Sequence, residues 1–186
     1  MGNNFQFLVN KVGATLDDAI ELLNQASIDF KLFWQSRDNE GCYVTSQIAI
    51  KNFDYIINEI VRERDALSLS ANAQYAQDYR DILDVHIGEV DENITPQDFQ
   101  DLTIQPGNAR IRVGKITKPI SLNKLLNKMK HRIPNCLNFR IENGDHILVI
   151  GADAFLRQPE CIVEFKVEKF CSESQKISDL FKSNAS

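Results

Sequence analysis

The dipeptide Asn143-Gly144 constrains the fold of this chain more than any other short segment. Apolar and polar residues alternate over 137–141 before it, and a second apolar run follows over 146–150. Asn-Gly readily takes the positive φ angles of a two-residue hairpin turn. The sequence therefore predicts a β-hairpin over 137–150, and a further alternating stretch over 161–168 predicts another strand beyond it.

The N-terminal half is expected to hold three helices and a second hairpin. Apolar residues recur at helical spacing over 15–26, in a stretch that begins after Asn52, and over 71–87. Between the first two of these stretches, apolar and polar side chains alternate over 28–35, and a polar turn follows. Residues 28–50 are therefore predicted to form a β-hairpin.

The second half begins with a region of no sustained period, 88–108, which is expected to be a linker or a long surface loop. Residues 109–113 alternate and predict a strand. Ser121 is expected to cap a fourth helix that ends before Pro134, because proline disfavours helical conformation in the residue before it. Ser172 is expected to cap a C-terminal helix.

Together these elements predict an α+β fold: a mainly antiparallel sheet of about five strands built from hairpins, with helices packed mostly on one face. The length of 186 residues suits a single domain, 1–186, with a full hydrophobic core. Two alternatives stay open. The chain could be two-lobed, 1–88 and 109–182 joined by loop 88–108, or it could be a duplication of a helix–hairpin–helix unit, although few side chains match between the halves.

Cysteine usage and hydropathy predict a cytoplasmic protein that needs neither disulfides nor a membrane anchor. The four cysteines form no C-x-x-C pair, so free thiols in a reducing compartment are expected. No apolar run approaches the roughly 18 residues of a membrane helix, and the start of the chain does not look like a secretory leader. The cysteines are Cys42, Cys136, Cys161 and Cys171.

The sequence carries no recognisable catalytic or cofactor motif, so no cofactor or metal is predicted. The glycines form no phosphate-binding loop, and the cysteines and histidines have no zinc-ligand spacing. If the chain is an enzyme, its site must form by tertiary proximity, around Asp145-His146 or a cysteine. Enzymatic activity is the third of the three function classes considered.

Charge is segregated along the middle of the chain, although the net charge is only −5. One segment is acidic, with Arg80 as its only cation: Asp78, Asp81, Asp84, Glu89, Asp91, Glu92, Asp98 and Asp101. The next segment is basic and contains no acid: Arg110, Arg112, Lys115, Lys118, Lys124, Lys128, Lys130 and Arg132.

This segregation predicts a surface that recognises another molecule. The favoured function is a non-enzymatic protein-binding module of the chaperone, immunity or adaptor type, by analogy with small acidic α+β proteins, acting in a hetero-complex or as a homodimer. The alternative is nucleic-acid or phosphate-ligand binding by the basic segment, which the net negative charge disfavours. A third reading is that the two segments neutralise each other. The candidate partner-binding residues are Arg110, Arg112, Lys115, Lys124, Lys128, His131, Asp91 and Glu92.

Overall fold

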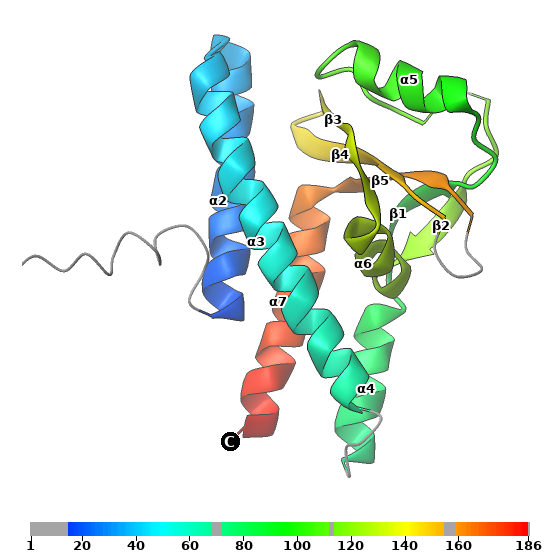
Figure 1. Ribbon diagram of the computed structural model, residues 1–186. Coiled ribbons are helices and arrows are strands. Elements are labelled where there is room, and N and C mark those ends of the chain that lie inside the picture. Colours follow the sequence, from blue (N-terminus) through cyan, green and yellow to red (C-terminus); the bar gives the residue numbers. More distant parts are fainter. Residues whose placement is uncertain (1–14, 68–71, 112–113, 155–158, 186) are drawn as a thin grey trace, which may run out of the picture.

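The computed structural model describes residues 15–67, 72–111, 114–154 and 159–185, which form helices and one five-stranded sheet (Figure 1). The elements, in chain order and with the labels of Figure 1, are α2 (Leu16–Ser36), α3 (Asn39–Ala66), α4 (Ala73–Leu83), β1 (His86–Asp91), α5 (Pro96–Ile104), β2 (Lys118–Ser121), α6 (Leu122–Lys130), β3 (Arg132–Glu142), β4 (Asp145–Ala152), β5 (Cys161–Lys166) and α7 (Val167–Ala185). No helix among the described residues is long and apolar enough to cross a membrane.

The strand order is β2-β1-β5-β4-β3, and every neighbouring pair is antiparallel. Helices α2, α3, α4, α6 and α7 lie on one face of the sheet, and α5 lies on the other (Figure 1). The main hydrophobic core fills the space between the sheet and the larger helical layer, and a smaller cluster lies under α5. The prediction of an α+β fold, with helices mostly on one face, is confirmed.

The Asn143-Gly144 hairpin forms as predicted. Strands β3 and β4 pair from Leu137–Ile150 to Glu142–Asp145, which leaves Asn143 and Gly144 as the two turn residues. Their φ angles of 53° and 85° are the positive values that this tight turn requires. The hairpin places the side chains of alternate β4 residues, beginning at His146, against the helical layer.

The predicted hairpin over 28–50 is wrong, because this stretch is helical. Helix α2 continues past residue 26, since Phe30 extends the buried stripe begun by Leu23 and Ala26. Arg37 ends α2 in a left-handed conformation, and the carboxylate of Asp38 accepts the Gly41 N–H at the start of α3. The first and second halves of the chain therefore do not repeat one order of elements.

Other boundaries also differ from the predictions. The supposed loop 88–108 contains most of β1 and all of α5, and the capping box of Thr95 and Asp98 starts that helix. Residues 109–111 belong to no named strand, and 112–113 lie outside the described residues. Helix α7 begins at Val167, directly after β5, so Ser172 is inside it and not at its start.

Candidate functional site

Some lysines of the basic segment form ion pairs with carboxylates of the same chain. Lys115 lies beside two buried carboxylates, with its Nζ 3.1 Å from Asp98 Oδ2 and 3.6 Å from Asp91 Oδ2. The same ammonium donates to the backbone carbonyl of Asn93 at 2.6 Å. Lys115 therefore joins the end of β1 to the first turn of α5, and it has a structural partner for its charge.

Two more candidate residues, Glu92 and Lys128, have partners within the chain. Lys118 Nζ is 2.7 Å from Glu92 Oε2, and this contact is the main reason that the pKa of Glu92 is lowered. Lys128 is buried, and its Nζ donates to the carbonyl of Pro159 at 2.8 Å. The sequence left open whether the acidic and basic segments neutralise each other. They do so in part, because Glu92 pairs with Lys118, and Asp91 and Asp98 lie beside Lys115.

The remaining predicted residues differ in exposure. Arg110 and Lys124 are exposed, and His131 is half-buried at the C-terminal end of α6. Arg112 lies outside the described residues. The structure therefore brings Lys115 together with Asp91 and places Lys124 where its charge helps to lower the pKa of Glu92, whereas Arg110 lies outside the named helices and strands.

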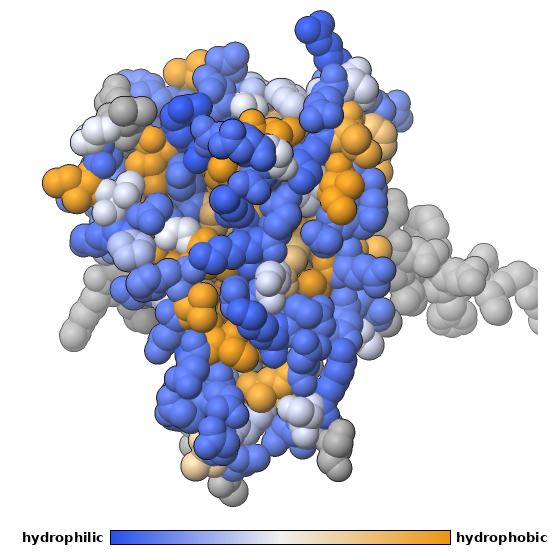
Figure 2. All heavy atoms as spheres, turned by 180° about the vertical axis from the view of Figure 1, so that it is seen from behind, coloured by the Kyte–Doolittle hydropathy of each residue, from blue (hydrophilic) through white to orange (hydrophobic). Residues whose placement is uncertain are grey.

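Helix α4 and its C-cap carry three carboxylates spaced three residues apart, of which Asp81 and Asp84 are exposed and Asp78 is half-buried; we call this set the α4 acidic face (Asp78, Asp81 and Asp84). Residues three apart lie near each other on a helix, so the three side chains follow one another along it. Asp78 and Asp81 each accept a hydrogen bond from a neutral glutamine, Gln74 at 2.6 Å and Gln77 at 2.7 Å. No ion pair between described residues involves the three carboxylates, and the surface over α4 is mostly hydrophilic at the lower left of Figure 2.

None of the four cysteines is placed for nucleophilic chemistry. All four are free thiols, and burial is the largest cause of the raised pKa of each one. A thiol acts as a nucleophile through its thiolate, which a raised pKa makes scarce at neutral pH. Within the described residues, no group of His, Cys, Asp and Glu side chains could hold a metal ion.

An apolar cavity of about 80 Å³, partly open to solvent, lies between the α2–α3 pair and the β3–β4 hairpin. Its walls are mainly aliphatic and aromatic, and its polar lining residues are Ser27, Thr45, Ser46, Arg132 and His146. The His146 ring stacks on Phe30, with centroids 4.9 Å apart and planes 6° apart, and Phe139 meets it edge-on at 5.8 Å. These two aromatic contacts fix the orientation of the imidazole at the cavity wall.

The polar atoms of His146 have unequal surroundings. Nδ1 is 3.0 Å from the hydroxyl of Ser27, a residue of α2 that is itself buried. Nε2 is buried and has no hydrogen-bond partner among the described residues. The pKa of His146 is lowered to about 4, mainly by burial; the nearby charge of Glu168 opposes this shift, and that of Lys31 contributes to it. The imidazole is therefore neutral at pH 7.

Sequence reasoning placed His146 beside the hairpin turn but gave no sign of this cavity. Ser27 and His146 are 119 residues apart, and Ser27 fell between the predicted helix over 15–26 and the predicted hairpin over 28–50. The only available signal was the alternation of β4, which puts His146 on the same face as Leu148 and Ile150. No family model, curated protein or solved structure matches this chain.

Proposed function

We propose that this chain is a non-enzymatic module that binds a protein partner, and that the α4 acidic face contacts a basic surface on that partner. The observation that supports the proposal is the unfavourable position of these carboxylates. Asp81 lies in the last turn of α4 and Asp84 is its C-cap, where the helix dipole disfavours negative charge.

Mutual repulsion adds to this cost. Like charges three or four residues apart on a helix are destabilising, by about 0.2–0.5 kcal/mol for each pair. Asp78, Asp81 and Asp84 are spaced in this way; Arg80 lies one turn before Asp84, but no ion pair between described residues involves the three carboxylates. Binding to a basic partner would relieve this repulsion, and such complementarity favours rapid and specific association.

The internal pairing of the basic segment supports an acidic surface over a basic one. Lys115 and Lys118 are engaged by carboxylates of the chain itself, and Lys128 is buried. Arg110, Lys124 and Lys130 remain exposed, so they are the cations for the alternative, binding of a phosphate ligand or nucleic acid.

The test is a comparison of two sets of charge reversals in the full chain. We expect Asp78→Lys, Asp81→Lys and Asp84→Lys together to weaken capture of a protein partner from the native lysate by about tenfold or more. The fold should survive, because lysine near the end of α4 suits the helix dipole, and circular dichroism would check this.

The matched control is Lys124→Glu with Lys130→Glu, which alters two exposed cations of α6. Under the proposal this control leaves capture of the partner unchanged. Loss of partner only in the control, or steeply salt-dependent binding of an oligonucleotide that the control abolishes, would favour the basic segment instead. Capture unaffected by either set would refute a charge-directed surface.

A further inference from the structure

We propose that the cavity beside Ser27 and His146 binds a small, largely apolar molecule whose oxygen accepts a hydrogen bond from His146 Nε2–H. This site is independent of the α4 acidic face, because it lies between the α2–α3 pair and the β3–β4 hairpin. Four features of the structure carry the inference: the cavity, the unpaired nitrogen, its fixed tautomer and its fixed ring.

The unpaired nitrogen is the first indication of a ligand. His146 is 7% exposed, so Nε2 gains little hydration, and no described residue satisfies it. A buried polar atom without a partner is costly, and few such atoms occur in native proteins. A bound molecule with a suitable polar atom would satisfy this one.

The hydroxyl of Ser27 determines which kind of polar atom is needed. Ser27 Oγ makes its described hydrogen bond to Nδ1 of His146, and a buried hydroxyl requires an acceptor for its proton. Ser27 therefore donates to Nδ1, and the proton of the neutral imidazole resides on Nε2. Nε2–H is a donor, so the complementary ligand atom is an acceptor such as an alcohol, phenol or carbonyl oxygen.

The walls determine the rest of the ligand. Phe30 and Phe139 hold the imidazole plane, and side chains such as Leu23, Phe53 and Leu148 line the remainder of the cavity. An enclosed apolar cavity of roughly 150 Å³ accepts benzene. This cavity is smaller, at about 80 Å³, but it is partly open, so a single ring or a short chain would enter with one edge at the mouth.

Phenol is a suitable probe, and toluene is its matched partner of similar shape without the oxygen. We expect phenol to bind the wild-type chain about three- to tenfold more tightly than toluene, the worth of one hydrogen bond. Titration calorimetry measures this ratio, and the Nε2–H resonance of His146 is expected to shift with phenol and not with toluene.

Two variants separate the parts of the site. His146→Phe keeps an aromatic ring against Phe30 but removes the donor, so phenol and toluene should bind it equally. Ala49→Leu fills the cavity from α3 and should abolish binding of both probes. The second variant keeps the test decisive if the first packs differently.

Three results would overturn the proposal. One is failure of phenol to bind the wild-type chain at millimolar concentration. Another is a preference for phenol that persists in His146→Phe. The last is a shift of the Nε2–H resonance of His146 on addition of the captured protein partner but not on addition of phenol. That result would mean that the cavity receives a side chain of the partner.

Discussion

The free energy of unfolding is expected to fall by about 2 kcal/mol between about pH 7.5 and about pH 5 through His146 alone. The unfolded chain takes up this proton near the ordinary pKa of 6.5, whereas the folded chain takes it up only near pH 4. Between these values the unfolded state binds more protons, so acidification favours it. The stabilisation is complete above the unfolded pKa and is lost as the pH falls towards 4.

Several charged and polar groups surround His146, so the prediction needs a difference measurement. Glu168 on α7 and Lys31 on α2 act on its charge, and Ser27 is hydrogen-bonded to Nδ1. Urea unfolding of the wild-type chain and of His146→Phe at a series of pH values gives two curves. The gap between these curves should change by about 2 kcal/mol over the interval. A constant gap would mean that folding does not lower the pKa of His146.

Strong local signals predicted the C-terminal part of the fold well. The turn at Asn143-Gly144 and the cap at Ser121 depend on backbone geometry within a few residues, so the sequence alone contains them. The direct passage from β5 into α7 was missed. The buried stripe of α7 begins at Val167 and continues through Phe170, which the alternation of the preceding strand obscured.

The stretch over 28–50 shows why a short alternation is ambiguous. Phe30 and Trp34 lie one helical turn apart and face inward, while Ile28 and Leu32 lie on the outer side at 39% and 58% exposure. Such a run looks alternating in a window of eight residues because apolar side chains occupy both sides of the helix. The longer helical period that starts at Leu16 was the better guide.

The candidate sites were predictable only in part. Segregation of charge is visible in the sequence, but the pairing of Lys115 with Asp98 depends on how α5 folds against β1. The α4 acidic face emerges only after those pairs are known. The cavity at His146 needs contacts between segments more than a hundred residues apart, and no local pattern encodes such contacts.

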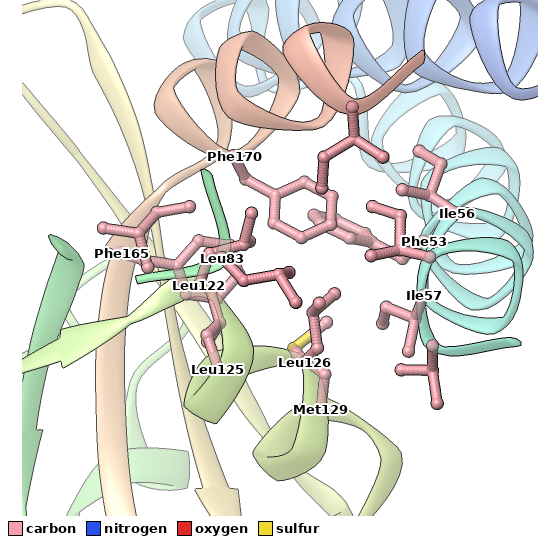
Figure 3. Packing of buried hydrophobic residues seen from close by; sticks show 14 of the residues in the cluster. Phe53, Ile56, Ile57, Leu83, Leu122, Leu125, Leu126, Met129, Phe165 and Phe170 are labelled. Carbon is pink, nitrogen blue, oxygen red and sulfur yellow. The ribbon is translucent and has the colours of Figure 1, made fainter. Parts of the chain in front are cut away.

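Phe170→Ala is expected to lower the free energy of unfolding by about 3–5 kcal/mol. Phe170 is fully buried in the first turns of α7, and its ring centroid lies 5.0 Å from that of Phe53 and 6.0 Å from that of Phe165 (Figure 3). One ring thus connects α7 to α3 and to β5. Removal of the ring leaves a void, and the void cannot close because backbone elements hold its walls on three sides.

The matched control is Phe181→Ala, at the far end of the same helix. Phe181 is half-buried and stacks on Tyr79 at 6.0 Å, so its loss should cost clearly less. Urea unfolding of both variants measures the difference. Since α7 begins at Val167, which lines the cavity of His146, Phe170→Ala should also weaken phenol binding, whereas Phe181→Ala should not. Equal costs for the two variants would contradict the packing of α7 against the sheet, and with it the wall that α7 supplies to the cavity.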